Sequence, residues 1–228
     1  GLSVNYTITL VNGSLTINKA PLTAIADNKV KVYGDPNPVF SITYTGFKGG
    51  DDASSLGSPI TVSSTASEAS GYGVYPITLT GGSSSNYTIS LSPGTLTVDK
   101  APLIITAENK TKIYGSVNPG LSFTHSGFKG SDGPGSLSSQ PLILTTATTT
   151  SNAGLYSINL SGGSSSNYTL ILVSGVLTIS KATITVQASN QSRLYGAVNP
   201  SLSIVYSGFV NSETSAVLDV MPTASTTA

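Results

Sequence analysis

Three acidic side chains stand 81 residues apart, at Asp51, Asp132 and Glu213 (132 − 51 and 213 − 132). A carboxylate that recurs in every copy of a repeat is the first candidate for acid–base catalysis or for a calcium ligand. Each of these acids, however, stands near the start of a short segment that ends in leucine, and in two copies (49–56 and 211–218) this segment suits a turn or two of helix. Because a carboxylate at a helix start accepts hydrogen bonds from free backbone N–H groups, we predict a capping role for all three.

A repeated calcium site has little support in the sequence. Calcium requires several oxygen ligands, usually with clustered carboxylates. Asp51-Asp52 is the only adjacent acid pair, and the other copies read Asp132-Gly133 and Glu213-Thr214. This pattern allows a weak ion site in one copy and does not predict a repeated calcium clamp.

The remaining reactive side chains do not form a catalytic set. There is no cysteine, and His125 is the only histidine. The equivalent positions in the other copies are Tyr44 and Tyr206, which predicts an aromatic strand position for His125. No serine stands near a base in a recognisable arrangement, and no glycine-rich loop suits a phosphate. We therefore predict that the protein is not an enzyme and has no catalytic, cofactor-binding or metal-binding residues.

Lysine chemistry gives one further hypothesis, an intramolecular Lys–Asn isopeptide cross-link at Lys100 or Lys112. Such a bond needs a buried lysine beside an asparagine and an acid. Arg193 replaces Lys112 in the third copy, and charged side chains are rarely buried, so both observations count against the bond.

Tyrosines provide a candidate ligand surface, because their faces can stack on sugars. Of the 11 tyrosines, all but Tyr72 lie at four repeat positions: 6/87/168, 33/114/195, 44/206 and 75/156. Aromatic positions that recur within alternating strands usually face a core, and there is no tryptophan. A multivalent weak glycan- or mucin-binding module is therefore the alternative function, and glycans are the alternative partners.

The charge content excludes two classes of partner. The 228 residues include 10 basic and 10 acidic side chains, and only 9% are charged. A neutral surface of this kind does not attract phosphate backbones, so we predict no nucleic-acid binding. No apolar run approaches the roughly 20 residues of a membrane span, so we predict no membrane insertion.

The period of 81 residues predicts a tandem array of small domains. Gly-Phe pairs at 46, 127 and 208 and Lys-Ala pairs at 19, 100 and 181 follow the same period as the acids. We place the boundaries at the Lys-Ala pairs. The predicted units are the C-terminal end of a preceding repeat (1–19), two complete repeats (20–100 and 101–181) and the N-terminal half of a further repeat (182–228). Gly-Gly-Ser-Ser-Ser at 81–85 and 162–166 is the alternative boundary, which we interpret instead as a loop between paired strands.

Apolar and polar residues alternate within each unit, as in half-buried strands. One predicted strand places Leu22, Ala24 and Ala26 on one face, and further predicted strands contain Phe40, Ile42 and Tyr44, then Tyr75, Ile77 and Leu79, then Tyr87, Ile89 and Leu91. Asn12-Gly13, Pro93-Gly94 and Ser174-Gly175 are predicted to turn the chain into a final strand as tight hairpins.

Two short segments complete the prediction for each unit. Tyr-Gly-x-x-Asn-Pro begins at Tyr33, Tyr114 and Tyr195, and its glycine, asparagine and proline predict a turn between strands. Tyr33 is predicted to close one end of the core. The segments 49–56 and 211–218 predict a helical turn, whereas the glycine and proline in 130–137 predict that the middle copy lacks it. The fold class is mainly β, in tandem small domains.

These residues, in this order, resemble the MBG domain of the YGX type. The matching stretches are Tyr33-Gly34, Thr45-Gly46-Phe47, Gly73-Val74-Tyr75, Asn86-Tyr87-Thr88-Ile89 and residues 94–101. The resemblance implies a β-grasp-like unit with one short helical turn, repeated in large bacterial surface or secreted proteins that are often adhesin-like. It carries no catalytic residues to transfer.

The short connection between units completes the functional prediction. Only Asp-Lys-Ala-Pro separates the apolar alternation of one unit from that of the next at 99–102, and Pro102 restricts φ. We therefore expect an elongated, stiff stalk or spacer whose partners are the neighbouring repeats of the same chain. The resemblance implies that it lies outside a bacterial cell, on the surface or secreted.

Overall fold

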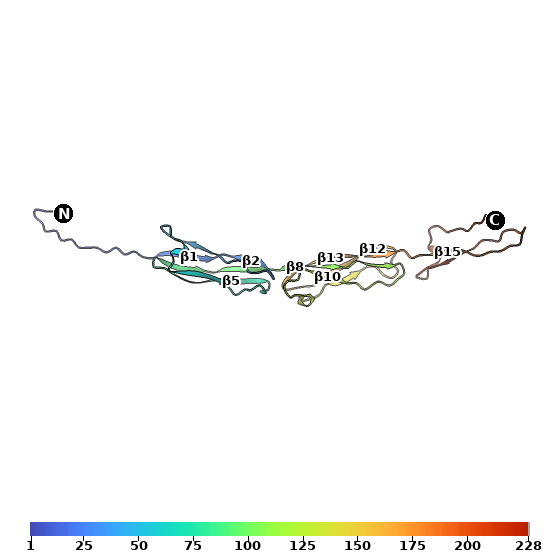
Figure 1. Ribbon diagram of the computed structural model, residues 1–228, viewed down its shortest axis with the longest axis horizontal. Helices are drawn as coiled ribbons and strands as arrows, with labels where there is room; N and C mark the ends of the chain where they lie inside the picture. The colour runs from blue at the N-terminus through green and yellow to red at the C-terminus, as the bar shows by residue number, and fades with distance from the viewer. Residues whose placement is uncertain (228) are drawn as a thin grey trace. The chain divides into compact units, whose positions relative to one another are not determined.

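The computed structural model describes residues 1–227, which are built from strands and three single 3-10 turns (Figure 1). The chain divides into two units, residues 1–100 and the part from Ala101 onward, and each is described by itself. None of the helical segments within 1–227 is long and apolar enough to cross a membrane. Residues 1–19 contain no strand and are solvent-exposed.

The first unit contains one complete repeat made of two sheets. Its elements are β1 (Ala20–Ala26), β2 (Lys29–Val32), β3 (Ile42–Thr45), a 3-10 turn (Ala53–Ser55), β4 (Ser58–Ser64), β5 (Gly73–Ser83), β6 (Tyr87–Ser92) and β7 (Gly94–Asp99). The strand orders are β3-β1-β6 and β2-β7-β5-β4. The β1–β6 and β2–β7 pairs are parallel, whereas the other pairs are antiparallel.

The second unit repeats this architecture and then begins it again. Its complete repeat consists of β8 (Ala101–Ala107), β9 (Lys110–Ile113), β10 (Phe123–Ser126), a 3-10 turn (Pro134–Ser136), β11 (Leu142–Thr145), β12 (Gly154–Ser161), β13 (Tyr168–Val173) and β14 (Gly175–Ser180). The sheets are β10-β8-β13 and β11-β12-β14-β9. There follow β15 (Thr185–Ala188), β16 (Ile204–Ser207), which pairs with β15, and a 3-10 turn (Ser215–Val217).

The core of each complete repeat lies between its two sheets. In β1, the alternating residues Leu22, Ala24 and Ala26 are buried, and Ala24 and Ala26 contact Leu96 and Val98 of the opposite sheet in one cluster. A strand with one buried and one solvated face requires this alternation, which the sequence showed. The mainly β class is confirmed. A helix packed across one sheet, as in a β-grasp unit, has no counterpart among residues 1–227, where each complete repeat has two facing sheets.

The predicted final hairpin is wrong. β6 and β7 do not pair with each other: β6 lies beside β1 in one sheet, and β7 lies between β2 and β5 in the other. The chain crosses between sheets at Pro93-Gly94, next to the point where β1 leaves the same sheet. A Cβ atom on Gly94 would lie 2.4 Å from the Ala26 carbonyl oxygen. The glycine is therefore required for close backbone approach rather than for a turn.

Three local predictions also need correction. Gly81 and Gly82 continue β5 instead of forming a loop, and positive φ angles at both glycines let the backbone bend there. Gly162 and Gly163 do lie in a loop beyond the end of β12, but in both repeats the strands on either side belong to different sheets and are not paired. The middle copy does have the 3-10 turn, because Pro134 occupies its first position, where a missing N–H costs nothing. Phe40 precedes β3 instead of lying in it, although it packs against the core.

Replacing Gly175 by alanine tests the close approach in the second repeat. A Cβ there would lie 2.6 Å from the Ala107 carbonyl oxygen, so we expect a loss of about 1–3 kcal/mol in the stability of that repeat. Amide hydrogen exchange of the full chain measures this loss, with residues 20–100 as an internal reference. Gly120→Ala is the matched control, because nothing lies within 4 Å of its Cβ position. Equal protection in the two variants would contradict the close-approach role.

Candidate functional site

A buried lysine organises the repeated Tyr-Gly motif. Lys31 is 6% exposed, and its Nζ donates to the carbonyl oxygens of Asp35 (3.0 Å), Ser67 (2.7 Å) and Glu68 (3.5 Å). An ammonium group has three donors, so these acceptors satisfy it completely and make its burial tolerable. The lysine thus ties the motif to the loop that precedes β5.

The second repeat has the same arrangement. Lys112 is 8% exposed and donates to the carbonyl oxygens of Ser116, Thr148 and Thr149 at 3.0, 2.7 and 3.5 Å. In the third copy, Arg193 keeps one such bond, to the Ala197 carbonyl oxygen at 3.0 Å. All of these acceptors are backbone carbonyls, so the loop side chains can change without loss of the bonds. This explains why a fixed lysine faces loops of different sequence.

The turn predicted for the motif is confirmed. Gly34 has a φ of 78°, and the Asp35 N–H donates to the Val32 carbonyl oxygen at 3.1 Å. The Asn37 carboxamide donates to the Ala66 carbonyl oxygen at 2.6 Å, so the motif contacts the same loop twice. Tyr33 packs against the core, as predicted. The lysine bonds could not be predicted from the sequence, because backbone acceptors leave no residue pattern.

The recurring acid Asp51 pairs with a tyrosine hydroxyl and does not cap the neighbouring helical turn. The Tyr87 hydroxyl donates to Asp51 Oδ2 at 2.7 Å and accepts the Lys48 N–H at 2.9 Å, and its ring contacts Phe47 edge-on. The cap of the 3-10 turn is Asp52, which accepts the Ser54 N–H. The capping role predicted for Asp51 is therefore wrong, since its carboxylate points to β6.

Asp132 and Glu213 correct the same prediction in the other copies. The Tyr168 hydroxyl donates to Asp132 Oδ2 at 2.6 Å and accepts the Lys129 N–H at 2.9 Å. Glu213 Oε1 accepts the Tyr114 hydroxyl at 2.5 Å, whereas Thr214 caps the third 3-10 turn. The recurring acid accepts a tyrosine hydroxyl in all three copies, but the tyrosine comes from the Asn-Tyr pair of the same repeat in the first two and from the Tyr-Gly motif of the preceding repeat in the third.

These hydrogen bonds shift the tyrosine ionisations. The bond to Asp51 raises the pKa of Tyr87, because removal of the phenol proton would place a second negative charge beside the carboxylate. The bond to Glu213 raises the pKa of Tyr114 for the same reason. Both hydroxyls are therefore donors at neutral pH and are not activated for acid–base chemistry.

A pocket of about 370 Å³ lies within the second unit, beside Glu213. Its lining includes Tyr114, Ala182, Ile184, Gly208 and Phe209. Next to it, a Cβ on Gly115 would lie 2.5 Å from a Val210 methyl group, so the Tyr-Gly turn is packed closely against the third copy. The predictions did not identify this pocket, because its walls come from two copies of the repeat.

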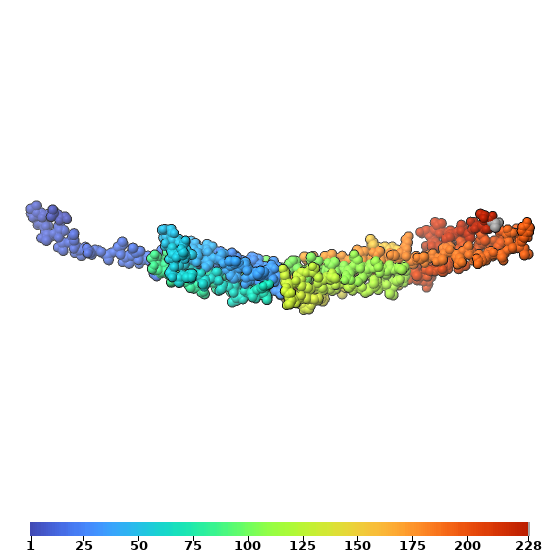
Figure 2. Space-filling model, in the orientation of Figure 1, coloured from blue at the N-terminus to red at the C-terminus, as the bar shows by residue number. Residues whose placement is uncertain are grey.

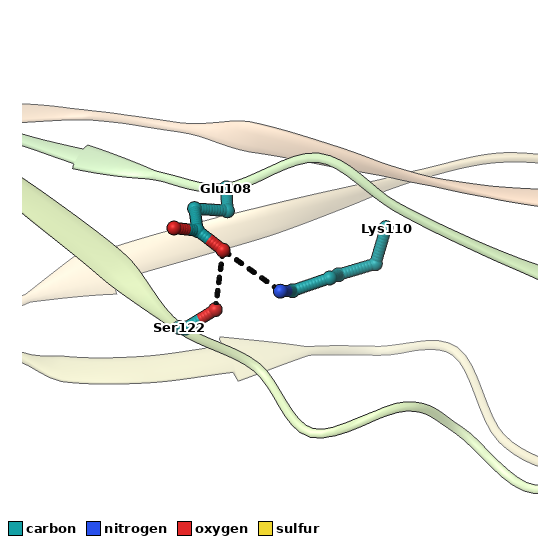
Figure 3. Close-up of polar contacts among 3 residues, drawn as sticks. All are labelled: Glu108, Lys110 and Ser122. Carbon is teal, nitrogen blue, oxygen red and sulfur yellow. Dashed lines mark hydrogen bonds and ion pairs between the residues drawn. The ribbon is translucent and has the colours of Figure 1, made fainter.

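A second repeated carboxylate, Asp27 or Glu108, directly follows the first strand of each complete repeat. The Glu108 carboxylate accepts the Ser122 hydroxyl at 2.7 Å and the Lys110 ammonium at 2.8 Å (Figure 3). In the first repeat, Asp27 accepts Ser41 and Thr43. The hydrogen bond from Lys110 is the main cause that lowers the pKa of Glu108. The hydrogen bonds from the Ser41 and Thr43 hydroxyls are the main causes that lower the pKa of Asp27. These acids join the end of one strand to its neighbour.

The remaining candidates occupy structural positions. His125 lies in β10 and contacts the rings of Phe123 and Phe128, as predicted for an aromatic strand position. The Lys112 Nζ donates to carbonyls, and the Lys100 Nζ lies 5.4 Å from the ring centroid of Tyr72. The isopeptide bond stays a hypothesis. Across residues 1–227, no three His, Cys, Asp or Glu side chains are grouped to hold a metal ion.

Comparison with protein-family models gives three matches to the MBG domain (YGX type), over residues 22–97, 103–178 and 184–228. The chain belongs to this family. No curated protein matches the chain. Each MBG match contains one Tyr-Gly motif, one recurring acid and the Gly-Phe pair described above. Three tandem MBG repeats indicate a repeat region of the kind found in surface proteins.

Replacing Lys31 by methionine tests the buried ammonium of the first MBG repeat. The substitution keeps an apolar stem but leaves three carbonyl oxygens without their donor, so we expect a loss of about 1–3 kcal/mol in the stability of that repeat. Amide exchange of residues 20–100 measures it, with Lys48→Met as the control because the Lys48 side chain is exposed. An unchanged exchange rate would show that water replaces the ammonium at no cost.

Replacing Asp51 by asparagine tests the tyrosine–carboxylate pair. Because the carboxylate raises the pKa of Tyr87, its removal should let one tyrosine ionise at lower pH in an absorbance titration. In the unchanged chain, the stability from this bond is present below pH about 10 and is lost as pH rises through the raised pKa. Asp52→Asn is the control, since Asp52 bonds to Ser54 instead. Identical titrations of both variants would refute the pairing.

Proposed function

We propose that this MBG array is a non-catalytic, stiff spacer in a large adhesin-like protein that acts outside a bacterial cell, on its surface or secreted. One observation carries the proposal. The Asp99 carbonyl accepts the Tyr33 N–H at 2.8 Å, and the Ala101 N–H donates to the Asn167 carbonyl at 2.9 Å. Only Lys100 lies between residues fixed in separate repeats, so few backbone dihedrals are free.

The junction inside the second unit supports the same proposal. The Ser180 carbonyl accepts the Tyr114 N–H at 2.8 Å, and the Tyr114 hydroxyl donates to Glu213 of the next copy. The backbone of this tyrosine thus holds the last strand of its own repeat, while its side chain holds the following repeat. A contact of this kind restricts bending in addition to the short linker. It makes the neighbouring repeat the proposed partner.

Strand directions suit a spacer under tension. Within the first unit, β1 begins the repeat and pairs in parallel with β6, and β2 pairs in parallel with β7, which ends it. Pulling the two ends of the repeat apart slides parallel partners along each other. The inter-strand hydrogen bonds are then loaded together instead of one at a time, which gives high resistance to force.

Four of the repeated tyrosines count against glycan binding, the alternative function. The hydroxyls of Tyr87 and Tyr168 are used by Asp51 and Asp132, and both residues are buried. Tyr75 and Tyr156 donate to backbone carbonyls of their own repeats. These four tyrosines therefore support the repeat itself, which favours the spacer over a sugar-stacking surface at these positions.

Spin labels on exposed residues test the stiffness of the junction. Because the chain has no cysteine, Val74→Cys and Leu155→Cys give one label in each complete repeat at equivalent exposed positions. We expect a narrow distance distribution by pulsed electron resonance, and a broad one after insertion of four Gly/Ser residues between Lys100 and Ala101. The same insertion between Gly49 and Gly50, in an exposed turn, is the control. A distribution that is already broad before insertion contradicts the proposal.

A further inference from the structure

The turn after β2 contains an Asp-Pro peptide bond in the first repeat alone. The three turns read Tyr-Gly-Asp-Pro-Asn-Pro, Tyr-Gly-Ser-Val-Asn-Pro and Tyr-Gly-Ala-Val-Asn-Pro, and Asp35-Pro36 is the only Asp-Pro pair in the 228 residues. The second repeat keeps the lysine bonds, the positive φ of the turn glycine and the asparagine contact with Ser116 and Val117 in these places. The shape of the turn therefore does not require an aspartate followed by a proline.

An aspartate followed by proline has the groups needed to break its own peptide bond. A side-chain carboxyl oxygen that attacks the carbonyl carbon of the same residue closes a five-membered ring, and such an intramolecular attack has a large rate advantage over attack by water. The leaving group is the proline nitrogen, which carries no N–H in the chain and leaves as a secondary amine once it takes up a proton. The other two copies lack both the carboxyl group and the proline at these positions.

The buried lysine donates to the carbonyl oxygen of this same bond. Lys31 Nζ lies 3.0 Å from the Asp35 carbonyl oxygen. Its other acceptors, the carbonyl oxygens of Ser67 and Glu68, hold the ammonium in place. Attack on the carbonyl carbon moves negative charge onto the Asp35 carbonyl oxygen, where a fixed, buried cation stabilises it. The contact that supports the turn is thus also placed to stabilise the charge that develops during cleavage.

The bond is anchored on both sides and is open to solvent. The Asp35 N–H donates to the Val32 carbonyl oxygen at 3.1 Å, and the Asn37 carboxamide donates to the Ala66 carbonyl oxygen at 2.6 Å. Between these anchors, Asp35 is half-buried and Pro36 is exposed. Water and protons therefore reach the proline nitrogen while the carbonyl group stays against the ammonium.

We propose that the first repeat cleaves its own backbone between Asp35 and Pro36. The Asp35 carboxyl oxygen bonds to the Asp35 carbonyl carbon, the bond from that carbon to the Pro36 nitrogen breaks, and the carboxyl proton passes to this nitrogen. One water molecule then opens the cyclic anhydride and leaves a chain that ends at Asp35 with two carboxyl groups. The step needs no other reactant and occurs once per chain. It does not depend on the spacer function.

Cleavage at this bond leaves the repeat folded. β1 and β2 precede the bond, whereas their partners follow it: β1 pairs with β3 and β6, and β2 pairs with β7. In the space-filling view the segments of the first repeat before and after the bond form one packed body (Figure 2). The two pieces are then held together by strand pairing and core packing alone. They separate in denaturant, or when a pull along the chain shears the two parallel pairs.

Incubation of the full chain at about pH 4, where carboxyl groups are partly protonated, tests the proposal. A denaturing gel and intact masses should show fragments 1–35 and 36–228, whose masses together equal that of the chain plus one water. We expect cleavage about tenfold faster in the folded chain than in denaturant at the same pH, because only folding places Lys31 at the carbonyl oxygen. Asp35→Ser should abolish cleavage. Asp219→Ser, at an exposed aspartate outside the first repeat, is the control.

Transfer of the pair into the second repeat separates the chemistry from loss of folding. Lys112 Nζ lies 3.0 Å from the Ser116 carbonyl oxygen, so Ser116→Asp combined with Val117→Pro should create a second cleavage between these positions. Val117→Pro alone should not. In the first repeat, Lys31→Met should reduce the rate to that in denaturant, whereas Lys31→Arg should retain most of the acceleration, since Arg193 makes the same bond at 3.0 Å.

Two results would overturn the proposal. One is a folded chain that cleaves at Asp35-Pro36 no faster than the denatured chain. The other is a transferred pair that stays intact in the second repeat under conditions in which the first repeat is cut. Cleavage at both places, with the fragments still associated until denaturant is added, is the expected result.

Discussion

The fold of each repeat depends on two strand pairs that change sheets side by side. β1 and β6 lie together in one sheet, and their continuations, β2 and β7, lie together in the other. The backbones approach closely at the crossing, where Gly94 faces the Ala26 carbonyl. This crossing closes the core along one side and joins the beginning of a repeat to its end. It also sets the parallel direction of the β1–β6 and β2–β7 pairs. A repeat without its last two strands therefore lacks one wall of its core.

The sequence predicted the features that depend on local pattern. Alternation identified the buried faces of Leu22, Ala24 and Ala26, and the period of 81 residues identified the array. Sequence failed where the partner of a strand or side chain had to be known. Pro93-Gly94 has the composition of a hairpin turn, and only the position of β1 shows that its glycine serves a backbone crossing. Asp51 has a local explanation in the adjacent helical turn, but its partner is Tyr87, 36 residues further along the chain.

The copies also show which substitutions the fold accepts. His125 stands in β10 where the other copies have tyrosine, because the position requires an aromatic ring against Phe128. The imidazole and phenol rings both meet this requirement, although their polar groups differ. Gly133-Pro134 replaces Asp52-Ala53 because a proline is as well suited as a capped residue to the first position of a 3-10 turn. In both cases the geometry of the backbone is kept while the side-chain chemistry changes. This is the variation expected at positions where the backbone geometry, and not the side-chain chemistry, is required by the fold.

The buried lysine, in contrast, keeps its side-chain chemistry in both complete repeats, although burying an ammonium group is costly. Removing an ammonium group from water is unfavourable, and a methionine of similar length would fill the same space without that cost. Methionine, however, could not bind carbonyl oxygens from two separate loops at once. Lys31 and Lys112 accept the desolvation because three bonds each fix the Tyr-Gly turn at one end of the core. In the second repeat that turn positions Tyr114, whose hydroxyl reaches the next copy. A charge buried inside the second repeat thus supports the turn whose tyrosine contacts the following copy.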